Sequence, residues 1–158
     1  METSENMQLQ VSALNDLIRI NTDRITGYKK RMDITLDDDL EDLFSLFIDQ
    51  SVENINYLTK YIYILGGRPT DGTSLSGKFY HAWVDFKLTV IKQDRQTLLD
   101  YCEYSEDVAK SAYSKVLDDQ ELTTNDKRLL HLLTLQYLGF KTSHQQVKIL
   151  RDRAAAAA

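Results

Sequence analysis

The stretch Leu65–Gly77, LGGRPTDGTSLSG, is the one strong interruption in this chain. It holds the only proline, Pro69, and four of the six glycines. Glycine and proline are the residues that most strongly punctuate regular structure. On both sides of the stretch, apolar residues recur at alternating spacings of four and three, as in a helix that presents one apolar face to its neighbours. The sequence therefore predicts an all-helical protein with a break near its middle.

Before the break, the spacing predicts two long helices, at residues 6–32 and 36–65. The first carries the stripe Met7, Val11, Leu14, Ile18, Asn21, Ile25, Tyr28 and Met32. The second carries Leu40, Leu43, Phe44, Phe47, Ser51, Asn54, Ile55, Leu58, Ile62 and Leu65. Thr35, with Asp38 three residues later, is suited to cap the second helix. Two long helices joined by so short a turn are expected to lie side by side and antiparallel.

After the break, helices are predicted at residues 75–91, 94–118 and 124–152, the last two beginning at the capping residues Asp94 and Thr123 with Asp126. Residues 66–93 are long enough to travel the length of a bundle. We therefore expect one domain, residues 1–153: a four-helix bundle of two antiparallel hairpins, joined by a long crossover that contains an extra helix. An up-and-down bundle with 75–91 as a full fifth member is the alternative. The alanine tail, 154–158, is not interpreted.

The composition excludes several classes of protein. With 24 acidic and 19 basic residues the net charge is −5, and no helix face gathers lysine or arginine into a stripe, so nucleic acid is not an expected partner. No apolar run approaches the roughly 20 residues of a membrane span. The N-terminal segment lacks the features of a signal peptide, so a cytoplasmic location is expected. Cys102 is the only cysteine and falls on an apolar stripe, which indicates a small core residue.

Five separated blocks resemble a bacterial family of ferritin-like four-helix-bundle proteins of unknown function. They are ALNDLIRINTDRITGYKK from Ala13, LGGRPTDGTSLSG from Leu65, HAWVDFK from His81, CEYSEDVAKSAY from Cys102 and KTSHQQVKILRD from Lys141. The resemblance extends from about residue 12 to 152. It implies a ferritin-like crossover bundle and brings no substrate, reaction or partner. Members of the family carry an acidic residue where this chain has Gly139, which weakens any inherited metal site.

Carboxylate-bridged di-metal sites in such bundles use Glu-x-x-His pairs, whose spacing places both ligands on one inward face. The chain contains no such pair. His81 and His144 follow a lysine by three residues, and His131 follows Arg128 by three. The alternative is a divergent site for iron or manganese, built from Glu106, Glu53, Gln50 and Gln136, although amides are poor ligands for iron.

Polar residues stand in the middle of the four long stripes. They are Asn21, Ser51, Asn54, Ser105 with Glu106 beside it, and Gln136. Buried amides and hydroxyls are costly unless they are hydrogen-bonded, so we interpret these residues as a polar core network that fixes the register of the helices.

The function predicted from these patterns is non-enzymatic. We expect an interaction or structural role with a metal-free polar core, no cofactor, and a protein partner or self-association. The competing hypothesis is a divergent ferritin-like di-metal oxidase or metal-handling protein. A third is a helical module that binds a small apolar ligand, because the stripe of residues 94–118 is rich in small side chains. Tyrosines are abundant, and some of them are expected at the surface.

Overall fold

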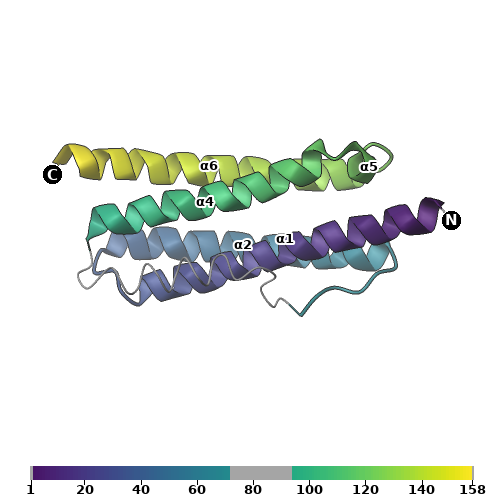
Figure 1. The fold of residues 1–158 in the computed structure, drawn as a ribbon. Coiled ribbons are helices and arrows are strands. Elements are labelled where there is room, and N and C mark those ends of the chain that lie inside the picture. The colour runs from purple at the N-terminus through teal and green to yellow at the C-terminus, as the bar shows by residue number, and fades with distance from the viewer. Residues whose placement is uncertain (1, 72–93, 158) are drawn as a thin grey trace.

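The computed structural model describes residues 2–71 and 94–157, and all the regular structure in these residues is α-helical (Figure 1). The helices are α1 (Glu2–Met32), α2 (Asp38–Ile64), α4 (Arg95–Asp118), α5 (Gln120–Thr123) and α6 (Lys127–Ala157). The predicted helix at 75–91 lies outside the described residues. The prediction of an all-helical chain is therefore confirmed for the part that the structure describes.

The helix boundaries differ from the predicted ones near the caps. Helix α2 begins at Asp38 because Asp37 takes the N-cap position, while Thr35 accepts a hydrogen bond from the Asp37 amide (3.2 Å). Asp94 caps α4, its carboxylate accepting from the amide of Gln96 (3.0 Å). The predicted helix 124–152 begins three residues later, at Lys127, since the short helix α5 precedes it. Helix α6 continues through the alanine tail to Ala157.

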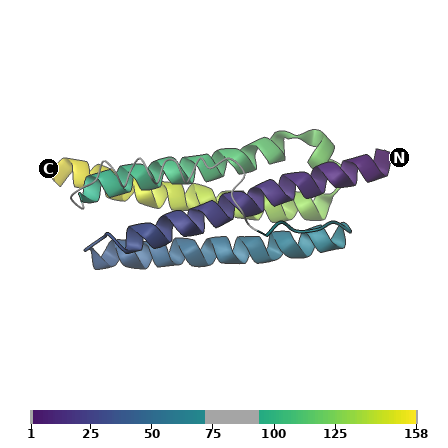
Figure 2. The ribbon, with the colours of Figure 1, turned by 60° about the horizontal axis from the view of Figure 1, so that its bottom comes forward.

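The four long helices form two antiparallel hairpins, α1 with α2 and α4 with α6 (Figures 1 and 2). Helices α2 and α4 begin at the same end of the molecule, where Arg95 pairs with Asp37 (2.9 Å) and Asp39 (2.6 Å). Because α2 ends at the far end, the connection between them has to return along the whole bundle. The placement of the helix ends agrees with the predicted crossover, most of which (residues 72–93) lies outside the described residues.

The first part of this return is held against α1. Gly66 ends α2 with a φ of 82°, in the left-handed region that glycine adopts without strain. Asn15 then binds the chain from both sides: its amide donates to the carbonyl of Arg68 (3.1 Å) and its carbonyl accepts from the amide of Thr70 (2.8 Å). The alternative of a five-helix bundle concerns residues 75–91, which the structure does not describe.

The core of the described residues contains two apolar clusters, each formed by all four long helices. One lies toward the start of α1 and the α5 end of the molecule and includes Leu14, Leu58 and Leu133. The other lies toward the α1–α2 turn and includes Phe44, Leu98 and Val147. The polar positions in the middle of each stripe fall between these two clusters. The bundle core is therefore mainly apolar toward both ends and polar in between, although a buried arginine, Arg31, packs against Tyr28 and Tyr101 in the cluster near the α1–α2 turn.

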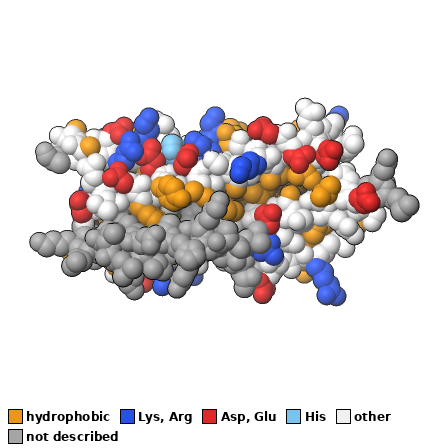
Figure 3. All heavy atoms as spheres, in the orientation of Figure 1, with side chains coloured by type: hydrophobic (Ala, Val, Ile, Leu, Met, Phe, Trp, Pro, Cys, Tyr) orange, Lys and Arg blue, Asp and Glu red, His pale blue; other side chains and the backbone are white. Residues whose placement is uncertain are grey.

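The surface shows no single dominant charge on the face drawn in Figure 3. Among the described residues on this face, lysine and arginine side chains are interspersed with acidic ones, with apolar side chains between them. None of the described helices is both long enough and apolar enough to cross a lipid bilayer.

The irregular segment after α2, residues 66–71, packs so closely on α1 that Gly67 has no room for a side chain. A Cβ atom there would lie 2.5 Å from Cγ2 of Val11 and 2.8 Å from its Cγ1. We expect Gly67→Ala to lower the free energy of unfolding by about 1–3 kcal/mol, measured by urea denaturation. Combining it with Val11→Ala should recover part of this loss. Gly66→Ala is the matched control: its cost comes from the backbone conformation, so Val11→Ala should not relieve it. Equal relief of both variants would contradict a local clash.

Candidate functional site

A layer of polar side chains, all buried except the partly buried Gln50, crosses the middle of the bundle. We call it the polar layer, and it consists of Asn21, Arg24, Gln50, Ser51, Asn54, Glu106, Tyr113, Gln136 and Ser143. Each of the four long helices contributes to it. Two hydrogen-bonded networks make up the layer, one around Arg24 and one around Tyr113.

The first network surrounds the guanidinium of Arg24, whose side chain is 0% exposed. Its Nε and Nη2 donate to the two carboxylate oxygens of Glu106, at 2.8 and 2.6 Å. Nη2 also donates to Oε1 of Gln50 (2.9 Å). Nη1 donates to the backbone carbonyl of Phe47 (2.9 Å) and to Oγ of Ser51 (2.8 Å). A guanidinium has five N–H groups, so every donor of Arg24 has a partner.

Glu106 is also 0% exposed and accepts a third hydrogen bond, from the hydroxyl of Tyr28 (2.8 Å). Burial raises the pKa of Tyr28 well above its usual value, and the nearby charge of Glu106 raises it further, so the hydroxyl remains a donor. For Arg24, burial lowers the pKa, but the charge and hydrogen bonds of Glu106 outweigh burial and the net shift is upward. The network therefore holds one permanent cation and one carboxylate away from water.

Aromatic rings complete the surroundings of this cation. The guanidinium carbon lies 4.9 Å from the ring centroid of Phe47 and 4.8 Å from that of Phe140. Tyr28, which donates to Glu106, has its ring centroid 5.4 Å away. Such rings attract a cation most strongly where water is excluded.

The second network joins all four helices through Tyr113. Asn21 donates to the Tyr113 hydroxyl (2.9 Å), which donates to Oε1 of Gln136 (2.6 Å). Asn54 donates to Oδ1 of Asn21 (3.1 Å), and Gln136 donates to the backbone carbonyl of Asn54 (3.3 Å). These bonds close a ring, and burial raises the pKa of Tyr113, so the phenol stays protonated.

The structure places the predicted polar core residues as follows. Asn21, Asn54 and Gln136 lie together in the Tyr113 network, while Ser51 and Glu106 lie in the Arg24 network. Ser105 is buried on α4 but joins neither network.

Sequence reasoning missed three members: Arg24, Tyr113 and Ser143. The sequence signal for the buried ion pair was the position of Arg24. It lies three residues after Asn21 and four before Tyr28, and both of those residues belong to the apolar stripe of α1. A cation at that depth, matched by the single carboxylate of Glu106, indicates a buried ion pair.

The residues considered for iron or manganese are not gathered into one site. Glu53 is exposed on α2, whereas Glu106 is buried and has both oxygens bonded to Arg24. Oε1 of Gln50 accepts from Arg24 and from Ser143 (3.1 Å), and Gln136 belongs to the other network. Among residues 2–71 and 94–157, no three His, Cys, Asp or Glu side chains are grouped to hold a metal ion. This donor set does not fit a di-metal centre, which requires several free carboxylates.

Gly139 lies beside the Arg24 network, on the side of α6 that faces α2. A Cβ atom at this position would be 2.7 Å from Nε2 of Gln50. The absence of a side chain at Gly139 therefore leaves room for the Gln50 amide. An acidic residue there would have to displace that amide from its place.

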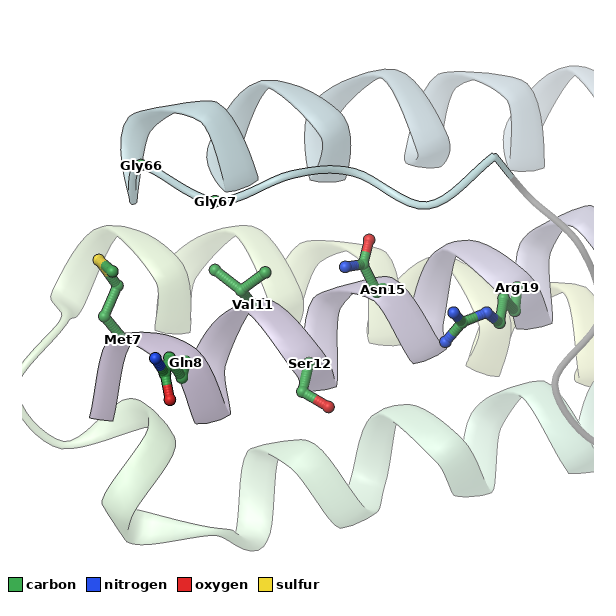
Figure 4. Close-up of a pocket in the computed structure, with 8 residues that line it drawn as sticks. All are labelled: Met7, Gln8, Val11, Ser12, Asn15, Arg19, Gly66 and Gly67. Atoms are coloured by element: carbon green, nitrogen blue, oxygen red, sulfur yellow. The ribbon is translucent and has the colours of Figure 1, made fainter. Parts of the chain in front are cut away.

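The hypothesis of a small-molecule pocket was based on the small residues of the 94–118 stripe. A groove of about 470 Å³ lies elsewhere, between the first half of α1 and the irregular segment of residues 66–71 (Figure 4). Its lining residues are Met7, Gln8, Val11, Ser12, Asn15, Arg19, Gly66 and Gly67. Arg19 is paired with Asp16 (3.1 Å), so the groove does not present an unpaired cation.

The Arg24–Glu106 pair gives a direct test of the polar layer. We expect Arg24→Met to lower the free energy of unfolding by about 3–5 kcal/mol, because it leaves the Glu106 carboxylate buried without a counter-ion. The double variant Arg24→Met/Glu106→Gln should lose less than the sum of the two single variants, by up to about 3 kcal/mol. Arg95→Met serves as the control, because its pair with Asp39 is partly exposed and should be worth less than about 1 kcal/mol. Additive losses in chemical denaturation would show that the two groups are not coupled.

Cys102 gives a second test, through its reactivity. Burial raises the pKa of its thiol to about 12, and the side chain is 0% exposed. Because the thiolate is the reactive form, we expect almost no reaction with a disulfide reagent at pH 8 until the chain unfolds. A cysteine at the exposed position Ser45, in a Cys102→Ser background, should react within seconds to minutes. Fast labelling of native Cys102 would mean that the middle of α4 opens readily.

The raised pKa also means that this thiol contributes stability at neutral pH that is lost as the pH rises from about 9 toward 12.

Comparison with known proteins adds a family and no activity. Residues 10–119 match the family described as "Domain of unknown function (DUF2383)", a range that includes Arg24, Gln50 and Glu106 and ends before α6. No curated protein matches the chain. Since the match covers more than half of the 158 residues, this chain belongs to the DUF2383 family of uncharacterised domains.

Proposed function

We propose that this chain is a non-enzymatic, ferritin-like helical bundle with an interaction or structural role, in which an ion pair takes the central place that a metal centre takes in other such bundles. The single observation that carries the proposal is the double hydrogen bond from Arg24 to both oxygens of Glu106. It commits the one buried carboxylate of the polar layer to a cation that is covalently part of the chain.

The term ferritin-like rests on topology. Two antiparallel hairpins whose inner helices, α2 and α4, begin at the same end are the arrangement of ferritin-like folds with one long crossover. The bacterial origin implied by the resemblance and a cytoplasmic location belong to the same proposal. A single buried cysteine is in keeping with a reducing compartment.

An interaction role draws support from the outer surfaces of α2 and α6. These helices are in contact through the hydrogen bond between Ser143 and Gln50. Leu46 and Tyr57 on α2, and Leu135 and Leu138 on α6, are each about half exposed. A contiguous patch of exposed apolar side chains is typical of a surface that contacts another protein, and we propose these four side chains as members of such a patch. The partner would be another protein or a second copy of the chain.

The decisive experiment is elemental analysis of protein purified without chelators or a histidine tag, followed by titration with iron and manganese under thermal melting. We expect far less than one equivalent of metal and no change in melting temperature. Glu53→Gln and Glu106→Gln form a matched pair, since the first carboxylate is exposed and the second is buried. One or two equivalents of metal, with a stabilisation that Glu106→Gln abolishes and Glu53→Gln keeps, would make this a divergent di-metal protein instead.

A further inference from the structure

The acceptors around Arg24 are all oxygens, and they converge on the guanidinium from two other helices. Phe47, Gln50 and Ser51 on α2 supply a backbone carbonyl, an amide oxygen and a hydroxyl, and Glu106 on α4 supplies two carboxylate oxygens. The five donor–acceptor distances run from 2.6 to 2.9 Å. Helix α1 contributes none of these acceptors; it supplies Arg24 itself and Tyr28, whose hydroxyl donates to Glu106.

Four of these five oxygens are positioned by bonds that do not involve Arg24. The Glu106 carboxylate is held by the hydroxyl of Tyr28, and the Gln50 amide oxygen by the hydroxyl of Ser143. The carbonyl of Phe47 belongs to the backbone of α2. The arrangement is thus a preformed receptor, and the aromatic rings of Phe47 and Phe140 lie at its sides.

The charge and shape of this receptor define what it would bind. Oxygen-only surroundings are what proteins use for cations, and one carboxylate balances one positive charge. Five acceptors arranged around a planar group, with aromatic rings nearby, favour guanidinium over a spherical ion. We infer that the polar layer contains a binding site for a guanidinium cation, and that the side chain of Arg24 is its built-in ligand. The inference goes beyond the proposed function, because it concerns what the site recognises and not what the protein does.

The inference is tested by removing the built-in ligand and supplying a free one. In the 158-residue chain, Arg24→Ala removes the guanidinium, changes none of the residues that supply the five oxygens and opens a space for a small cation. We expect it to melt well below the unaltered protein. Guanidinium chloride at low millimolar concentration should then raise its melting temperature by about 3–5 °C, the size expected for a ligand at roughly ten times its Kd.

Three comparisons separate specific binding from general effects. Sodium chloride at equal concentration controls for ionic strength, and urea supplies a neutral molecule of nearly the same shape. Leu58→Ala is the matched variant, because Leu58 is also 0% exposed but lies in the apolar cluster toward the start of α1. Stabilisation of Arg24→Ala by guanidinium alone, with none for Leu58→Ala, supports the inference. Equal stabilisation by urea, equal stabilisation of Leu58→Ala, or no stabilisation would overturn it.

A second pair of variants decides the matter if Arg24→Ala does not fold. Arg24→Lys keeps a cation within the oxygen cage, whereas Arg24→Met keeps an unbranched apolar chain. A cation site predicts that Arg24→Lys melts several degrees above Arg24→Met. A position that only needs to be filled predicts the reverse order, which would overturn the inference. The metal analysis of the unaltered chain is independent of both results, so failure here leaves the proposed function to stand or fall on its own test.

Discussion

The structure depends on a cation held where water cannot reach it. Removing a guanidinium and a carboxylate from water costs several kcal/mol for each ion, and the attraction between them offsets that cost only if their remaining hydrogen bonds are also made. In this bundle they all are: Arg24 uses its five N–H groups, and Glu106 accepts from Tyr28 as well. The requirement fixes the relative positions of α1, α2 and α4 far more tightly than apolar packing would.

The polar layer divides the core into two apolar clusters, and its hydrogen bonds fix the register in which the four long helices pack. Apolar side chains of similar size pack acceptably in several registers, but a helix that slides by one turn would break bonds in both networks. The ring through Tyr113 extends this control to α6, because Gln136 accepts from the phenol and donates back to α2. Stability comes mainly from the two apolar clusters, and specificity of register comes from the layer between them.

Sequence patterns predicted the helices well because one apolar face is a strong, repeated signal. They also predicted that polar residues within the stripes would form a network in the core, and Asn21, Asn54 and Gln136 do meet in one network. Partners were harder to predict. An arginine is usually at the surface, and this general tendency outweighed the one signal that the spacing offered, the position of Arg24 between Asn21 and Tyr28. Pairing depends on which turns of different helices lie at the same depth, and a single sequence does not contain that information.

The end of the bundle where α2 and α4 begin has a further consequence, because α1 and α6 finish there. Each helix carries a macrodipole, positive at its N-terminus and negative at its C-terminus. Helices α1 and α6 run in one direction and α2 and α4 in the other, so their dipoles cancel along the bundle. Acidic residues fill the first turn of α2 and basic residues the last turn of α1, so each pole meets charges of opposite sign within one short turn. Because the helix dipoles oppose one another in pairs, the orientation of the central ion pair is set by its immediate neighbours instead of by a net dipole along the bundle.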